Sequence, residues 1–149
     1  MQLAELHPAL THFPIALLMA AFFFQMIVLL KPKWMAPTVP LWILGLSVTI
    51  TLFAILSGEA AADLAASNAG VSQEVADLIA SHEQFGNITI WGSLILFGGW
   101  FWLRLRYGDS RRLGIVTLVC LFFLMLVVFY SGNLGSSLVF DHGVGVKLP

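Results

Sequence analysis

The chain has 149 residues, of which 59% are apolar and only 10% are charged. An average soluble domain carries roughly 25% charged residues, so this composition indicates a protein whose main solvent is lipid. The formal net charge is -1, and this value gives no reason to expect nucleic-acid binding. A single cysteine excludes an internal disulfide and a haem attached through a Cys-x-x-Cys-His motif.

Four apolar runs are each long enough to cross a bilayer as a helix, which takes about 20 residues. They cover residues 13–30, 41–57, 85–103 and 113–130. We therefore predict an all-α fold: a polytopic membrane protein whose single domain, residues 1–149, is a transmembrane four-helix bundle. Lysines follow the first run and no positive segment precedes it, which argues against a cleaved signal peptide. The sequence shows no internal repeat.

The longest connection, residues 59–84, has the character of an amphipathic helical segment outside the membrane. Ser72 suits a helix N-cap, and Glu74 then lies in the first turn, where a negative charge is favourable. Val75, Ile79 and His82 share one face of this predicted helix, which can run on into the third apolar run.

The basic residues are distributed unevenly between the two sides of the predicted membrane domain. Six of the seven lie in the connections after the first and third runs, namely Lys31, Lys33, Arg104, Arg106, Arg111 and Arg112. Seven of the eight acidic residues lie on the opposite side. Because basic residues in short loops are retained in the cytoplasm, we expect a multi-pass protein of the bacterial inner membrane with both termini in the periplasm.

All four histidines fall on the predicted periplasmic side: His7, His12, His82 and His142. Small residues share their helical faces, namely Gly86 next to His82, and Gly132 and Gly135 before His142. Small residues beneath histidines leave a slot between helices. Stripes of small residues also let membrane helices pack closely without any cofactor, so the stripes alone leave both interpretations open.

Haem iron takes two axial ligands on opposite faces of a flat macrocycle, and neutral imidazole is a suitable ligand. We therefore expect the four histidines to ligate the iron of one or two b-type haems, with the three glycines lining the slot. We expect His12 to pair with His82, and His7 with His142.

Two prolines support a bent N-terminal segment. Pro8 and Pro14 each stand where a proline would break or restart a helix. The segment from Leu6 to Phe13 is therefore expected to fold over the end of the bundle and to aim His7 and His12 differently.

Two other hypotheses use the same features. Copper or zinc would also accept imidazole ligands on the periplasmic face. Alternatively, the chain is a cofactor-free structural subunit of a respiratory or photosynthetic complex, with the small residues serving packing alone. No charged residue interrupts the apolar runs, which disfavours a transporter.

The two ends of the chain carry specific motifs. Residues 6–15 read LHPALTHFPI, and residues 142–146 read HGVGV. With these motifs the chain resembles, over nearly its whole length, the bacterial membrane proteins of domain-of-unknown-function family 2231. Members of that family are sometimes joined to Rieske-type or c-type cytochrome domains, so the resemblance implies periplasmic redox chemistry and favours haem over a bare metal.

The leading functional hypothesis is accordingly an electron-carrier subunit and not a stand-alone enzyme. It would relay electrons between quinol or a membrane complex and a periplasmic cytochrome, a Rieske-type protein or a larger respiratory complex. An oligomer is compatible with the sequence, and the lipid bilayer is the one partner that composition itself predicts.

Overall fold

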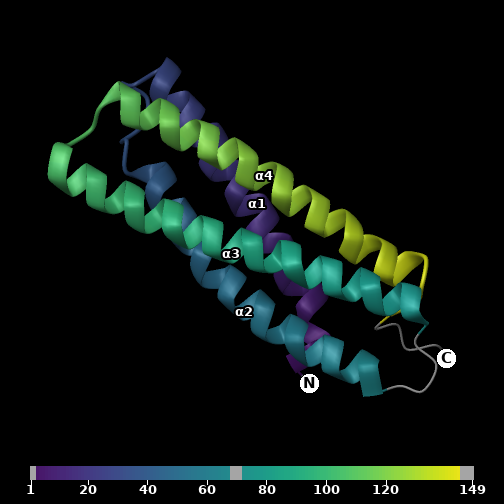
Figure 1. Cartoon of the computed structure of the whole chain (residues 1–149). Coiled ribbons are helices and arrows are strands. Elements are labelled where there is room, and N and C mark those ends of the chain that lie inside the picture. Colours follow the sequence, from purple (N-terminus) through teal and green to yellow (C-terminus); the bar gives the residue numbers. More distant parts are fainter. Residues whose placement is uncertain (1–2, 68–71, 145–149) are drawn as a thin grey trace.

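The computed structural model describes residues 3–67 and 72–144, which form four long α-helices (Figure 1). The helices are α1 (Leu3–Leu30), α2 (Val39–Ser67), α3 (Gln73–Tyr107) and α4 (Arg111–Phe140). The described residues contain no strand. The predicted all-α fold with four spanning helices is confirmed.

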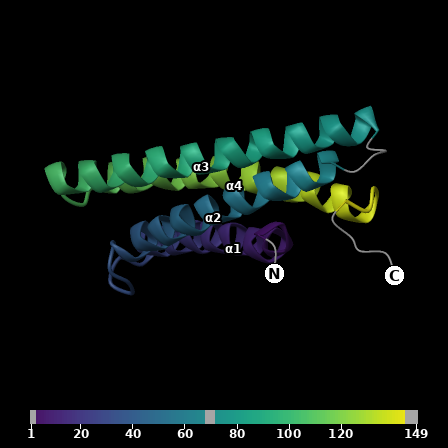
Figure 2. The ribbon, with the colours of Figure 1, turned by 90° about the horizontal axis from the view of Figure 1, so that it is seen from below.

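The helices form an up-and-down bundle in which each packs against its neighbours in the chain, and α1 also packs against α4. Within the described ranges, no Cα atom of α1 lies within 8 Å of one in α3, and the same holds for α2 and α4. These two pairs are therefore diagonal. Figure 2 shows α1 beside α2 and α3 beside α4.

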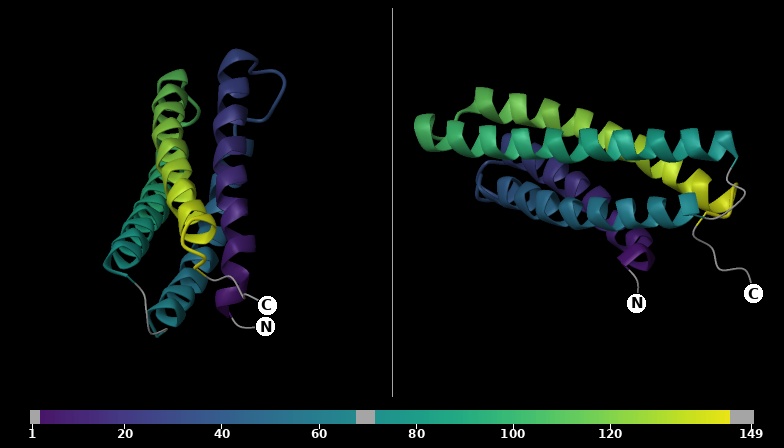
Figure 3. Two further views of the ribbon diagram at one scale, coloured as in Figure 1. Left: turned by 90° about the vertical axis from the view of Figure 1, so that its right-hand side faces the viewer. Right: turned by 60° about the horizontal axis from the view of Figure 1, so that its bottom comes forward.

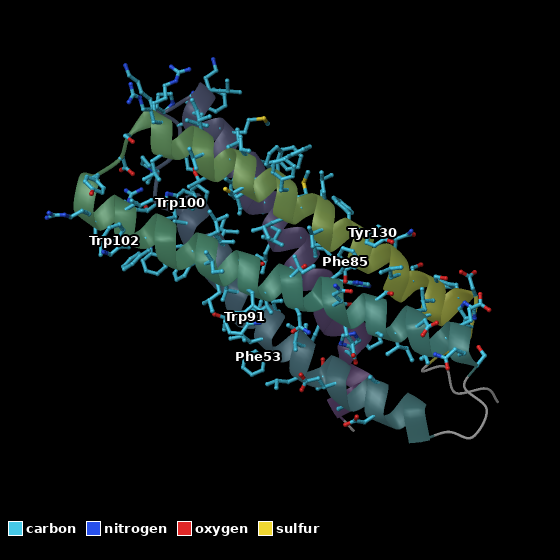
Figure 4. All side chains as sticks on the ribbon, viewed as in Figure 1. Phe53, Phe85, Trp91, Trp100, Trp102 and Tyr130 are labelled. Carbon is cyan, nitrogen blue, oxygen red and sulfur yellow. The ribbon has the colours of Figure 1, made fainter. Side chains whose placement is uncertain are left out.

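The outer surface of the bundle suits lipid. All four helices are long and apolar enough to cross a membrane. Large apolar side chains lie exposed along them, and Phe53, Trp91 and Trp102 point outward in Figure 4. A soluble monomer rarely exposes so extensive an apolar surface, because water would drive it to associate. The chain is a multi-pass membrane protein.

The helices are longer than the apolar runs that predicted them. α2 continues to Ser67 and α3 begins at Gln73, so the expected amphipathic segment consists of helix extensions on either side of a short connection. Residues 68–71 of that connection lie outside the described part of the chain. Ser72 caps α3 as predicted, and its side chain accepts a hydrogen bond from the Val75 backbone N–H.

The expected break at the N-terminus is wrong, because α1 runs without interruption through Pro8 and Pro14. A chain that left the helix here would expose several backbone polar groups to lipid, whereas a proline inside a helix removes only one donor. The first helix therefore begins at Leu3 and not near residue 13, and it holds both His7 and His12 on one rod.

The two ends of the bundle differ in charge. The turns after α1 and α3 lie together at what we call the basic end, where nitrogen-tipped side chains gather in Figure 4. The opposite end holds the start of α1 and the end of α4, together with the extensions of α2 and α3 (Figure 3). We call it the histidine end.

The apolar core lies in the middle of the bundle and toward the basic end. Its buried members are Leu18, Ala21, Leu41, Leu44, Trp100, Leu121, Leu124 and Val128. One polar contact crosses this region, because the buried Gln25 amide donates a hydrogen bond to the Gly114 carbonyl at 3.0 Å and so links α1 to α4. The histidine end has no comparable cluster of large side chains in the described residues, and it contains a cavity instead.

Candidate functional site

Two histidines meet across the bundle at its histidine end. His7 is on α1 and His82 is on the diagonally opposite helix α3. Their ring centroids lie 6.0 Å apart with an interplanar angle of 82°. Since the backbones of these helices stay more than 8 Å apart in the described residues, the contact is made by imidazoles that reach toward the bundle axis from both sides.

Each imidazole is held by a backbone carbonyl of the helix that follows its own. The Nδ1 atom of His7 lies 2.9 Å from the Ala54 carbonyl oxygen on α2. The Nδ1 atom of His82 lies 2.9 Å from the Ser131 carbonyl oxygen on α4. A carbonyl can only accept, so Nδ1 carries the proton in both rings, and a neutral ring then has a free lone pair on Nε2. Imidazole binds metals through such a nitrogen lone pair.

Serine hydroxyls lie beside both contacts. Ser57 Oγ is 3.2 Å from Nδ1 of His7 and donates its own proton to the Ala54 carbonyl at 2.8 Å. Ser131 Oγ is 3.4 Å from Nδ1 of His82. Such partners fix the tautomer and the orientation of a ligating histidine.

Two glycines make room for the rings. A Cβ atom at Gly58 would lie 2.8 Å from Cε1 of His7, and one at Gly135 would lie 3.0 Å from Cε1 of His82. The reason is geometric, because the carbonyl of a helical residue points toward the residue four positions later. A side chain that donates to Ala54 or Ser131 therefore lies over Gly58 or Gly135, and a larger residue there would displace it.

A cavity of about 630 Å³ surrounds the two histidines and is lined by residues from all four helices. Its lining includes Gly86, Gly132 and Gly135, three residues that the sequence indicated. The walls are mostly apolar, with Thr51 and Thr89 among the polar residues. Small-molecule and cofactor sites typically enclose roughly 300–1,000 Å³, so the cavity is large enough for a cofactor.

Acidic side chains also border the cavity, namely Glu59 on α2 and Glu83 on α3. Both residues are exposed. The described residues that line the cavity include no lysine or arginine, so the site is neutral to acidic and its chemistry depends on the two imidazoles.

The other two histidines lie elsewhere. His12 is exposed on α1, and His142 is exposed in the turn after α4; neither lines the cavity. The expected pairing of His12 with His82 and His7 with His142 therefore differs from the structure. Because α1 does not break, residues five apart on it are rotated by about 140°, and only one of His7 and His12 can face the bundle axis.

The described residues bring no three His, Cys, Asp or Glu side chains together as a metal-binding group. What they supply is two imidazoles with free Nε2 atoms. Sequence reasoning missed Ser57 and Ser131, and the carbonyl of Ala54. The available signal was a small residue followed four positions later by glycine, at Ala54 to Gly58 and at Ser131 to Gly135.

Comparisons with known proteins identify the family of the chain. No curated protein and no solved structure matches the chain. A family model described as "Predicted membrane protein (DUF2231)" matches residues 4–148. The match covers both terminal motifs and, apart from Leu3, all four helices, and the chain therefore belongs to the DUF2231 family of predicted membrane proteins.

Proposed function

We propose that the protein is a b-type cytochrome subunit that holds one haem between His7 and His82. One observation carries the proposal: two imidazoles from diagonal helices meet in a cavity with Nδ1 bonded to carbonyls and Nε2 free. When bound, haem supplies one-electron oxidation and reduction of its iron. The role of the protein residues is to ligate the iron, orient the ligands and exclude water.

The spacing of the rings suits two ligands of one ion. Two imidazoles bound to a single metal through facing Nε2 atoms, at about 2.0 Å each, have centroids about 6 Å apart. The ring centroids of His7 and His82 have this separation, 6.0 Å. Gly86, Gly132 and Gly135 leave space in the cavity wall where a flat macrocycle would meet the helices.

A single haem is favoured over two, because His12 and His142 are exposed outside the cavity. Haem is also favoured over bare copper or zinc. Zinc sites use three or four protein ligands, and the described residues offer two imidazoles. A porphyrin provides four equatorial nitrogens itself and needs only two axial ligands from the protein.

The proposed orientation follows from charge. The basic end holds six of the seven basic residues, and such residues are retained in the cytoplasm. The histidine end would then face the periplasm of a bacterial inner membrane. There the haem would exchange electrons with quinol or a membrane complex on one hand and a periplasmic cytochrome or Rieske-type protein on the other. A phosphatase fused after residue 149 should be active in the periplasm, and an inactive fusion in a stable protein would contradict this orientation.

The function is tested by the reduced-minus-oxidised absorption spectrum of the purified protein after expression with ample haem. We expect Soret and α bands and one haem per chain. His82→Ala and His7→Ala should each remove the six-coordinate spectrum, because each deletes one axial ligand.

His12→Ala and His142→Ala are the matched controls, and both should keep the spectrum. If the wild-type protein shows no haem bands, the proposal is lost and a cofactor-free structural subunit becomes the better explanation. If His12→Ala abolishes binding while His7→Ala does not, the ligand assignment is wrong.

A further inference from the structure

The two helical hairpins, α1–α2 and α3–α4, repeat one another at the site. In each, the first helix carries a histidine whose Nδ1 atom donates to a carbonyl of the second helix at 2.9 Å. In each, a glycine lies four residues after that carbonyl and directly under the ring. The order of approach is also the same: the atom nearest to an added Cβ is Cε1, then Nδ1, then Nε2.

The repeat extends beyond the site into the buried faces of the helices. The interval from His7 to His82 is 75 residues, and the same interval relates further buried positions of α1 and α3. These pairs are Pro14 with Thr89, Leu18 with Ser93, and Gln25 with Trp100. At these positions, α1 and α3 thus bury residues that correspond to one another at this interval.

The second helices match in the same way with an interval of 77 residues. This interval relates the two carbonyl-bearing residues, Ala54 and Ser131, and the two glycines, Gly58 and Gly135. It also relates four more pairs of buried positions, namely Pro40 with Thr117, Leu44 with Leu121, Ser47 with Leu124, and Thr51 with Val128. Side-chain types differ in most pairs. What repeats is therefore the spacing of the buried positions, and not the residue types.

We infer that the cavity is a single two-fold-symmetric site made of two equivalent half-sites, related by a pseudo-two-fold axis along the bundle. His7 and His82 would hold a planar macrocycle with one metal ion equivalently, one imidazole from each half-site. The identity of the ligand rests on the function proposed above, whereas the equivalence of the half-sites rests on geometry alone.

Equivalence restricts the chemistry of the site. Haem proteins that bind dioxygen or carbon monoxide need an open coordination position on the iron. A site in which both faces are closed by equally held imidazoles has none. Such a site would suit electron transfer and would disfavour exogenous diatomic ligands, which would have to displace an imidazole.

The half-sites can be compared without haem by nitrogen NMR of histidine-labelled protein. The double variant His12→Ala, His142→Ala removes two exposed residues and leaves only His7 and His82 to report. The spectra are recorded at a pH of about 8.5, which is above the reference pKa of histidine in model peptides, about 6.5. We expect both remaining rings to carry the proton on Nδ1. A ring protonated on Nε2 alone would overturn the inference.

Carbon monoxide binding by the reduced, haem-loaded protein is the second measurement. The wild-type spectrum should not change, whereas His7→Gly and His82→Gly should each open one face and bind carbon monoxide with affinities within about threefold of each other. Binding by the wild-type protein, or opening by only one variant, would overturn the inference. If no form binds haem, the proposed function fails while the NMR comparison still decides whether the half-sites are equivalent.

Discussion

The histidine end and the basic end of this bundle differ in how their interiors are filled, although the same four helices form both. Toward the basic end, large side chains such as Leu44, Trp100 and Leu121 fill the interior. At the histidine end, glycines and small hydroxyl residues leave a cavity of about 630 Å³ around two imidazoles. The difference shows that the large buried side chains and the cavity are divided along the bundle axis.

The largest effect is expected from a substitution in the packed core. Leu121 is fully buried in the core, so Leu121→Ala should lower the free energy of unfolding by about 2–5 kcal/mol through lost contacts and a new cavity. Unfolding in mixed detergent micelles measures this value. Leu126, which is 47% exposed on the same helix, provides the control Leu126→Ala. An equal loss in both variants would show that the interior is not packed as described.

The next largest effect is expected from a substitution that fills part of the cavity at the histidine end. Gly86 lines the cavity on the face of His82, and an added Cβ there would meet no heavy atom within 4 Å. Gly86→Leu should therefore leave the haem-free fold intact, yet weaken haem binding at least tenfold, or about 1.4 kcal/mol. Haem titration followed at the Soret band measures this loss. The exposed Gly99 gives the control Gly99→Leu, and the cavity assignment fails if the two variants bind haem equally.

The smallest effect is expected when the stabilities of two variants, each lacking one buried serine of α2, are compared. Ser57 donates to the Ala54 carbonyl beside His7, so Ser57→Ala should lower the free energy of unfolding by about 0.5–1.5 kcal/mol. Ser47 is equally buried, and its hydroxyl has no hydrogen-bond partner among the described residues. Ser47→Ala should consequently cause no loss of stability. A loss in the Ser47 variant that matches or exceeds the one in the Ser57 variant would contradict the assigned hydrogen bonds.

Much of the fold could be predicted because its signals are local. An apolar run of about 20 residues has to form a helix in lipid, since no water is present to satisfy its backbone groups. The helix ends were harder to predict. The extension of α2 to Ser67 and the passage of α1 through Pro8 and Pro14 depend on the cost of leaving a helix, which composition does not reveal.

The site was only partly predictable from the sequence. His7 and His82 were identified as histidines on one predicted side of the membrane, and Gly86, Gly132 and Gly135 from their helical spacing. All five lie at the cavity. His12 and His142 fall on the same predicted side but lie outside the cavity. A histidine near a membrane face is visible in a sequence, whereas the direction in which its helix turns it is set by contacts with other helices.

The sequence by itself determined the number of spans and the family. It also determined that basic residues gather at one end and histidines at the other. These properties follow from hydrophobic length, from charge and from local motifs. Only the tertiary structure decided that His7 meets His82, and that the two hairpins repeat one another at intervals of 75 and 77 residues. Lipid-facing and core positions accept many apolar side chains, so a repeat in register persists with little trace in the residues themselves.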